Sequence, residues 1–405
     1  MSVILICYNK YPQNLATLYS LKKQNNVDVS KIEVILVDDA SIDRTPRLMQ
    51  YNAPYQFKYI RNENTLGRAG AKNIGIKNAK GKVVIFLDGE MIVDKNFIHN
   101  HLRHYKKDEN IVVAGTTGHY VVYTTLYPEY TIEQMKELYT RMKDNRYFKK
   151  RLKLSPHNHN FNYRKLLYYR KKINKPILFL SKSAINSEIY KKVALPLPSF
   201  PGIVQNFGPE LNGYYLPWTF FITRNVSVSK RLLDIVGGFN EDFKGWGYED
   251  WELGYRLYKL GAKYIDDPTI LNYHQEHPYS KIDRRKEQMG NYSMFVTLHP
   301  DIEVCGFSLD LLKKRNLVEI NDMIEDYYRL IKDYPNKYQT FSSVLIRLLQ
   351  KIPFLLVDDE NVTGLFLKIN SSQKEKQQFL DDGEKIKQTA KYPHLSDIFD
   401  LLITL

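Results

Sequence analysis

The amino-acid sequence predicts an α/β fold, in which an open sheet of mainly parallel strands is covered by helices and is followed by a mainly helical C-terminal region. Two observations predict the sheet. Short apolar runs alternate with helical stretches along roughly the first 100 residues, as βαβ units require. The runs are continuously apolar, which indicates strands that are buried on both faces of a parallel sheet.

The predicted elements follow one another in a regular order. Strands are expected at Val3–Cys7, Ile32–Val37 and Lys82–Leu87, with a weaker strand at Phe57–Ile60. Helices are expected after Pro12, where Leu15, Leu18 and Leu21 share one face, and over a run of small residues from about Arg68 to Ala79. Ligands of open parallel sheets bind beyond the carboxyl ends of the strands, so a site is expected there.

One predicted helix of the C-terminal region has a strongly apolar face. Pro353 is expected to end this helix. We expect the face to pack against the rest of the protein, with a helix lying on a membrane surface as the alternative. Its apolar residues are Phe341, Val344, Leu345, Leu348, Leu349 and Ile352.

Composition narrows the classes of protein. The chain has 405 residues, of which 43% are apolar, enough for a buried core. Its longest uninterrupted apolar runs are much shorter than a bilayer span, which argues against an integral membrane protein. Two cysteines, Cys7 and Cys305, provide no disulfide framework, and the N-terminus resembles a strand more than a secretion signal. A cytoplasmic protein is therefore expected.

The net charge of +14 comes mainly from one segment. Between Arg141 and Lys175 there are 13 basic residues and one acidic residue, with aromatic residues among them. Three interpretations stay open: a solvated surface, a surface for an anionic membrane or phosphate-bearing acceptor, and a nucleic-acid contact. The third would make the chain a basic nucleic-acid-binding protein on a nucleotide-type fold, which a steep salt dependence of binding would reveal.

Acidic residues follow two of the predicted strands. Asp38 and Asp39 follow the second strand, and Asp88-Gly89-Glu90 follows the fourth. Two carboxylates at this spacing suit a hard divalent cation whose other ligands are diphosphate oxygens and water. The pattern also occurs in ordinary surface turns, so it needs further context.

The context is the segment Gly245–Glu252, which combines glycines, two tryptophans and paired acids at the start of a predicted helix. An aromatic ring such as Trp246 can stack on a sugar, and a carboxylate of Glu249 or Asp250 can take the proton of an attacking hydroxyl. His274 follows about 24 residues later and could complete the coordination of a cation. Its other interpretation is an ordinary packed or exposed side chain.

The order of these motifs resembles the family 2 glycosyltransferases. The resemblance covers about residues 1–110 and 215–280, and its second half is similar to galactosyltransferase-type and chondroitin-polymerase-type members. The motifs of the first half are Tyr8-Asn9, Val37–Ser41, Asn64–Gly67, Ala71–Gly75 and Phe86–Glu90. Those of the second half are Asn225–Val228, Gly237–Glu241, Trp246–Asp250 and His274–Glu276.

The resemblance implies a GT-A-type, Rossmann-like fold and transfer of a sugar from a nucleotide sugar, usually a UDP-sugar, with Mn²⁺ or Mg²⁺ as cofactor. Retaining relatives tend to have Asn where this chain has Asp250, so inversion is expected. The implied roles are nucleotide binding for Tyr8, Asp39, Lys72 and Asp88, metal binding for Asp88, Glu90 and His274, acceptor or sugar binding for Trp246 and Glu249, and catalysis for Asp250 as the base with Glu249.

The chain also departs from the family pattern. Glu90 stands where the family usually has Asp, and Lys72 stands where Arg is common, which removes bidentate phosphate geometry. A scaffold that has lost catalysis is therefore a further alternative. The acceptor stays open among a polysaccharide, another cell-surface polymer, a glycolipid and a peptide with a Ser, Thr or Cys acceptor.

The resemblance also predicts how the chain is organised. We expect a glycosyltransferase domain over residues 1–300, with a nucleotide-binding half at 1–110, a variable basic region on the acceptor side at 111–214 and an acceptor and catalytic half at 215–300. A helical region is expected at 301–405. The basic region is expected to face an anionic acceptor or the inner face of a membrane as a peripheral contact, and nucleic acid is the less favoured partner.

Overall fold

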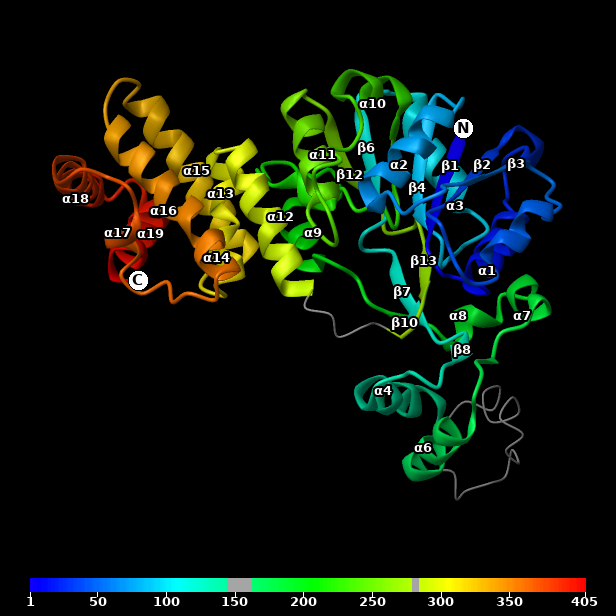
Figure 1. The fold of residues 1–405 in the computed structure, drawn as a ribbon. Coiled ribbons are helices and arrows are strands. Elements are labelled where there is room, and N and C mark those ends of the chain that lie inside the picture. Colours follow the sequence, from blue (N-terminus) through cyan, green and yellow to red (C-terminus); the bar gives the residue numbers. More distant parts are fainter. Residues whose placement is uncertain (144–161, 279–283) are drawn as a thin grey trace. The chain divides into compact units, whose positions relative to one another are not determined.

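The structure is a computed structural model, and it describes residues 1–143, 162–278 and 284–405 (Figure 1). It confirms the α/β class with a helical C-terminal region. Two compact units are present: the first consists of Met1–Pro201, Phe220–Phe239 and Lys259–Ile282. The second consists of Gly202–Thr219, Asn240–Tyr258 and Asp283–Leu405, so its helices begin earlier in the chain than residue 301.

The first unit is built on a seven-stranded sheet with the order β12-β6-β11-β4-β1-β2-β3. Strand β11 is antiparallel to both its neighbours, and the other pairings in the sheet are parallel. All four strands predicted in the first part of the chain are present, as β1, β2, β3 and β4. The strands are β1 (Ser2–Cys7), β2 (Glu33–Asp38), β3 (Gln56–Arg61), β4 (Val83–Asp88), β6 (Ile111–Ala114), β11 (Val226–Ser229) and β12 (Lys263–Asp266).

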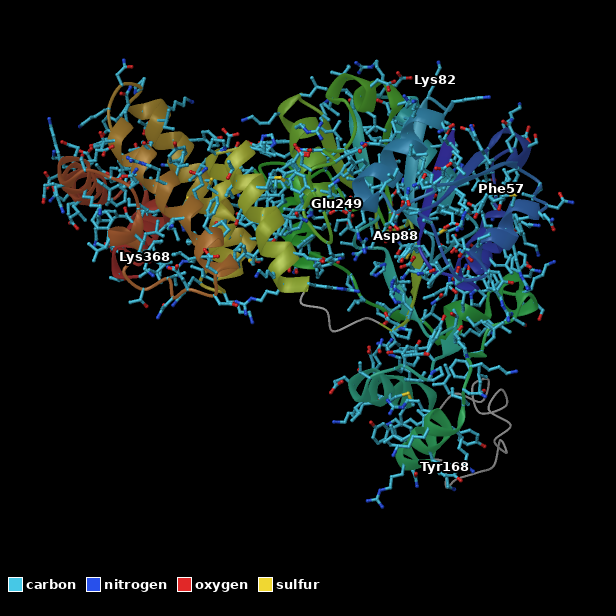
Figure 2. All side chains as sticks on the ribbon, viewed as in Figure 1. Phe57, Lys82, Asp88, Tyr168, Glu249 and Lys368 are labelled. Atoms are coloured by element: carbon cyan, nitrogen blue, oxygen red, sulfur yellow. The ribbon has the colours of Figure 1, made fainter. Side chains whose placement is uncertain are left out.

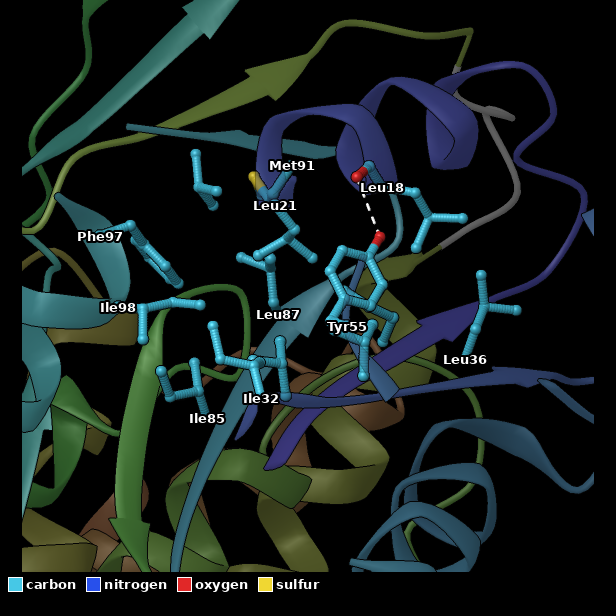
Figure 3. Close-up of a cluster of buried hydrophobic side chains, with 14 of the residues drawn as sticks. Leu18, Leu21, Ile32, Leu36, Tyr55, Ile85, Leu87, Met91, Phe97 and Ile98 are labelled. Carbon is cyan, nitrogen blue, oxygen red and sulfur yellow. Dashed lines mark hydrogen bonds between the residues drawn. The ribbon is translucent and has the colours of Figure 1, made fainter. Parts of the chain in front are cut away.

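Apolar side chains from the sheet and from α1 form one large buried cluster of this unit (Figure 3). The predicted Leu18 and Leu21 are fully buried in it, and the Tyr55 hydroxyl donates a hydrogen bond of 3.0 Å to the Leu18 carbonyl. Helix α2 contacts β1 and β2. The helices of this unit are α1 (Gln13–Leu21), α2 (Gly67–Asn78), α3 (Phe97–Leu102), α4 (Ile132–Met142), α6 (Tyr163–Lys172), α7 (Lys182–Asn186), α8 (Ile189–Val193) and α10 (Lys230–Val236).

Two smaller sheets extend the first unit. A four-stranded sheet has the order β10-β7-β13-β5, and a two-stranded sheet pairs β8 with β9. In the larger of the two, β13 is antiparallel to β5, and His274 lies opposite Met91. The strands are β5 (Met91–Val93), β7 (His119–Val122), β8 (Thr125–Leu126), β9 (Ile177–Leu178), β10 (Leu195–Pro196) and β13 (Asn272–Gln275).

A close approach of two chain segments fixes the turn between β4 and β5. The Gly89 amide donates a 3.0 Å hydrogen bond to the Ile6 carbonyl. A Cβ atom at position 89 would lie 2.8 Å from the Cys7 Cβ atom and 2.9 Å from the Ile6 carbonyl oxygen. Only glycine fits there without a shift of β1, so Gly89 sets how Asp88 and Glu90 leave the sheet.

The second unit is helical. Its helices are α9 (Pro201–Phe207), α11 (Glu249–Lys259), α12 (Arg284–Leu298), α13 (Ile302–Gly306), α14 (Ser308–Leu311), α15 (Leu317–Asp333), α16 (Gln339–Val357), α17 (Leu365–Lys368), α18 (Gln373–Gln388) and α19 (Pro393–Thr404). Helix α16 contacts α12, α13, α14, α17 and α18, and the six apolar residues predicted to share its face are fully buried. The face is thus buried by packing, and its partners are helices of the second unit.

Two details of α16 differ from the sequence-based expectation. The helix does not end at Pro353 but continues to Val357. Proline removes the backbone hydrogen bond to the residue four positions before it, whereas the residues after it can still continue the helix, and Leu355 in that last turn is buried. Among the described residues, α16 is also the one helix that is long and apolar enough to cross a membrane, although polar and charged residues interrupt its apolar runs. Its contacts with five other helices explain its apolar composition as that of a core helix.

Candidate active site

The predicted site residues Tyr8, Asp39 and Asp88 lie at one edge of the large sheet, because the parallel strands β1, β2 and β4 end there. Asp38 at the end of β2 pairs with Cys7, and Asp88 at the end of β4 pairs with Ile6 (Figure 2 labels Asp88). Tyr8 follows β1 directly and has 48% of its surface exposed. An exposed aromatic ring at this edge is suited to stack on a base.

The Asp39 carboxylate holds the segment that leads into α2. It accepts hydrogen bonds from the Asn62 side chain at 2.8 Å, from the Leu66 amide at 2.8 Å and from the Gly67 amide at 3.0 Å. Asp39 is 4% exposed, so its carboxylate makes these hydrogen bonds inside the protein. The structure gives it the role of shaping the loop at the sheet edge, and direct contact with a nucleotide stays a prediction.

Helix α2 joins the two motif-bearing parts of the chain. The Asn73 side-chain amide both donates to the Phe239 carbonyl at 2.9 Å and accepts from the Phe239 amide at 2.8 Å. The neighbouring Lys72 is only 2% exposed, and its ammonium lies 4.9 Å from the centre of the Phe239 ring. In this structure Lys72 is therefore packed inside the first unit, and its predicted contact with the nucleotide is not tested.

A group of potential metal ligands lies beside this sheet edge. Ligand atoms of Glu90, His274 and His277 all lie within 4.8 Å of one another. The pairing of β5 with β13 brings them together, since both the Gln275 amide and its side chain donate to the Glu90 carbonyl, at 3.1 and 3.0 Å. We call Glu90, His274 and His277 the cation group.

The two imidazoles of the cation group have their Nε2 atoms turned towards Glu90. His274 Nδ1 lies 3.1 Å from the Glu276 carboxylate, and His277 Nδ1 lies 2.9 Å from the Pro278 carbonyl oxygen. Both partners are acceptors, so each Nδ1 can donate to its partner, and Nε2 is the atom of each ring that is placed to bind a metal ion. The Nε2 atoms lie 4.0 and 3.3 Å from Glu90 Oε1. Two histidines oriented by acceptors, together with a carboxylate, form a donor set that fits a divalent cation.

A lysine also contacts the cation group. The Lys10 ammonium lies 2.9 Å from Glu90 Oε1 and 2.7 Å from His277 Nε2. Burial opposes ionisation of Glu90, which is 8% exposed, but the adjacent Lys10 ammonium holds the pKa of its carboxyl well below its usual range. Glu90 is therefore a buried carboxylate that remains ionised at neutral pH.

The cation group differs from the predicted set of ligands. Glu90 and His274 belong to both sets, whereas Asp88 lies outside the three-residue group and stays a prediction as a ligand. His277 was missed as a ligand in the sequence. The available signal was the spacing of two histidines at the end of one strand, but the family resemblance covers only the first of them.

In the second unit, α12 shapes the turn that precedes α11. The Asn291 side chain donates to the Lys244 carbonyl at 2.8 Å and to the Gly247 carbonyl at 2.9 Å, and the Trp246 amide donates to Glu287 at 3.1 Å. Gly247 has a φ of 108°, a conformation that favours glycine. The turn is thus fixed at both ends, with the half-buried Trp246 ring beside the Arg284 guanidinium at 5.8 Å.

The predicted acceptor and base residues occupy the first turn of α11. Glu249 is buried and begins the helix, and Asp250 is half-buried (Figure 2 labels Glu249). The partial positive charge of a helix N-terminus stabilises carboxylates there. A third acid of this turn, Glu252, is hydrogen-bonded inside the unit to Arg256 at 2.7 Å and to His299 at 3.0 Å.

The first unit thus brings together side chains whose chemistry suits a nucleotide and a cation, and the second unit has a fixed turn with an aromatic ring and two carboxylates. Comparisons with known proteins agree with a site of this kind. Residues 2–178 match the family model "Glycosyl transferase family 2", and residues 208–299 match the model "N-terminal domain of galactosyltransferase". These matches agree with the predicted recognition: residues 2–178 are similar to the family 2 glycosyltransferases, and residues 208–299 are similar to the galactosyltransferase domain.

Relatives of known sequence are of the same class. The chain is 29% identical over 278 residues to the uncharacterized glycosyltransferase YfnE of Bacillus subtilis, covering 68% of this chain and 65% of the relative. It is 25% identical to a hyaluronan synthase of Pasteurella multocida and 24% identical to a chondroitin synthase of Escherichia coli, covering 73% and 69% of this chain. The matches span only 26% and 35% of those two relatives.

Solved structures are similar at low sequence identity. TarS of S. aureus (residues 1–349), crystallised with UDP-GlcNAc, is 15% identical, with a TM-score of 0.46 and coverage of 88% of both chains. GalNAc-T7, crystallised with UDP, GalNAc and Mn²⁺, is 15% identical with a TM-score of 0.45, covering 82% of this chain and 57% of that one.

Proposed function

We propose that the chain transfers a sugar from a UDP-sugar to an acceptor hydroxyl, with inversion at the anomeric carbon and with the help of a divalent cation. The observation that carries this proposal is the cation group, Glu90, His274 and His277, next to the sheet edge where Tyr8 and Asp88 lie. Relatives named as hyaluronan and chondroitin synthases support a polysaccharide or another glycan as the acceptor.

The first unit would bind the donor. Tyr8 would stack on the uracil, Asp39 would hold the loop that shapes its pocket, and Asp88 would contact the nucleotide. Glu90, His274 and His277 would hold the cation, and the choice between Mn²⁺ and Mg²⁺ is open. When bound, the cation would neutralise charge on the departing diphosphate.

The second unit would bind the acceptor. Trp246 would stack on a sugar ring and Glu249 would orient the acceptor hydroxyl. Asp250 would accept the proton from that hydroxyl while the hydroxyl oxygen forms the bond to the anomeric carbon. The bond from this carbon to the phosphate oxygen breaks in the same step, and UDP leaves with the electron pair. One displacement of this kind inverts the configuration.

Hydrolysis of a panel of nucleotide sugars tests the donor class without knowledge of the acceptor. With Mn²⁺ present, we expect slow hydrolysis of UDP-sugars and much slower hydrolysis of GDP- and ADP-sugars, because the pocket beside Tyr8 is proposed to accept uracil. A preference for GDP- or ADP-sugars would overturn the assignment of the donor.

We also propose that α6 presents a basic surface to an anionic membrane or an anionic acceptor. On α6, Leu166 is buried in a cluster that includes residues of α4, whereas Lys171 and Lys172 are exposed. Arg170 instead donates to the Tyr130 carbonyl, which gives it a structural role. Part of the basic segment, including Lys149, Lys150 and Arg151, lies outside the described residues. Such a contact is consistent with a cytoplasmic protein acting at the inner membrane face.

Neutralising two of these charges tests the basic surface. We expect the double variant Lys171→Gln/Lys172→Gln to bind anionic vesicles roughly thirtyfold less tightly at low salt, because each cation near an anionic membrane contributes about 1 kcal/mol and about 1.4 kcal/mol is tenfold. Sedimentation with phosphatidylserine-containing vesicles measures this. The matched control is Lys374→Gln/Lys385→Gln, which changes two exposed lysines of α18. Equal binding of both variants would leave α6 as an ordinary solvated surface.

A further inference from the structure

We propose that the Lys10 ammonium takes the place of a metal ion in this site. It contacts ligand atoms of the cation group when no divalent cation is bound, and it has to move away before one binds. This inference rests on the proposed cation-dependent function. It adds a competitor that belongs to the protein itself and that controls when the metal site is available. The carrying observation is that Lys10 contacts two of the three members of the cation group, at 2.9 and 2.7 Å.

The chemistry of His277 makes the two occupants exclusive. Because His277 Nδ1 donates to the Pro278 carbonyl, the ring has a single lone pair, on Nε2. That lone pair accepts the hydrogen bond from Lys10 at 2.7 Å. A metal ion would need the same lone pair at about 2.1 Å. His277 can therefore bind either the ammonium or a metal ion at one time.

The burial of Glu90 explains why a cation is needed in the absence of metal. The Glu90 side chain is 11% exposed, and a buried carboxylate without a partner is strongly destabilising. Lys10 supplies the compensating charge at 2.9 Å. The cation group is thus kept assembled, with its charge balanced, while it waits for a metal ion. Removal of Lys10 leaves Glu90 available to an external cation.

The position of Lys10 indicates how the exchange takes place. The backbone on either side of it is fixed, since the Asn9 amide donates to Ser41 at 2.9 Å and the Tyr11 amide donates to Asp43 at 2.7 Å. The Lys10 side chain is 21% exposed, so it has access to solvent and can turn away while its backbone stays. Lys10 is two residues from Tyr8, so a bound diphosphate is an alternative partner for the ammonium. Binding of the donor and of the metal would then be positively coupled.

Titration with Mn²⁺ alone tests the inference, with free Mn²⁺ measured by electron paramagnetic resonance. Without nucleotide, Lys10→Met is expected to bind Mn²⁺ about tenfold or more tightly than the unmodified chain, because a like charge no longer occupies the site. Addition of UDP is expected to raise the Mn²⁺ affinity of the unmodified chain by a larger factor than that of the variant. Lys31→Met, which changes a lysine whose side chain is 82% exposed, is the matched control and should leave both values unchanged.

A second variant and two contradicting outcomes make the test decisive. Lys10→Gln keeps a polar side chain and is expected to show the same gain in Mn²⁺ affinity. It allows the test to be made even if the Met variant folds poorly. If the Lys10 variants bind Mn²⁺ no more tightly than the unmodified chain, the inference is overturned while the proposed cation site stands. If the unmodified chain and all variants fail to bind Mn²⁺ with and without UDP, the cation site and this inference fall together.

Discussion

Replacing Asp250 with asparagine should lower the rate of sugar transfer by at least about a hundredfold, because a positioned general base contributes roughly 10²- to 10⁴-fold. Asparagine is close to aspartate in shape, so the first turn of α11 is expected to keep its structure. Affinity for UDP should stay unchanged, since the donor is proposed to bind to the first unit. Single-turnover transfer and UDP titration on the same preparation measure the two quantities.

The matched control is Asp242→Asn, which changes an exposed acid a few residues before α11. It should retain full activity. Two results would contradict the role of Asp250: normal transfer by Asp250→Asn, or a parallel loss of UDP binding. The stereochemistry of the product is a second check, since a single displacement predicts inversion.

His277→Ala should weaken Mn²⁺ binding about as strongly as His274→Ala, by roughly tenfold to a hundredfold, because both rings present Nε2 to Glu90. Glu90→Gln should weaken it further, since it removes the buried charge of the cation group. Isothermal titration with Mn²⁺ in the presence of UDP gives these affinities. The prediction for His277 is the sharpest, because it arises from the structure and not from the family resemblance.

His99→Ala serves as the control, since His99 lies on α3 and is not part of the cation group. A His277→Ala variant with unchanged Mn²⁺ affinity would remove His277 from the site. Asp88→Ala distinguishes the predicted set of ligands from the observed one. A loss of Mn²⁺ binding as large as that of Glu90→Gln would show that Asp88 joins the site when the donor is bound.

Four strands of the first unit, β1 to β4, could be predicted well, because continuous apolar runs bounded by polar turns have few other interpretations. The predicted strand Ile32–Val37, for example, corresponds to β2 at Glu33–Asp38. Glu90 and His274 could be predicted as partners through the family resemblance. Their proximity depends on the antiparallel pairing of β5 with β13, which joins segments far apart in the sequence.

Other features could not be predicted, because they depend on tertiary contacts. Asp39 follows β2 like a ligand-binding acid, but only the structure shows that its carboxylate is taken up by the Leu66 and Gly67 amides. Lys10 carries no motif, and its role appears only when the loop after β1 is placed beside Glu90. Pro353 predicted the end of α16 by local propensity, and packing of the helix overrides that preference.

Cation-dependent hydrolysis of a UDP-sugar is the measurement that tests the central claim most directly, because it needs the donor site and the cation group but no acceptor. The proposed function predicts slow release of UDP with Mn²⁺, loss of this release on addition of a chelator, and recovery when Mn²⁺ is restored. Glu90→Gln should abolish the Mn²⁺-dependent part. Release of UDP that is equally fast with a chelator, or no release from any UDP-sugar at any Mn²⁺ concentration, would contradict a cation-dependent UDP-sugar transferase.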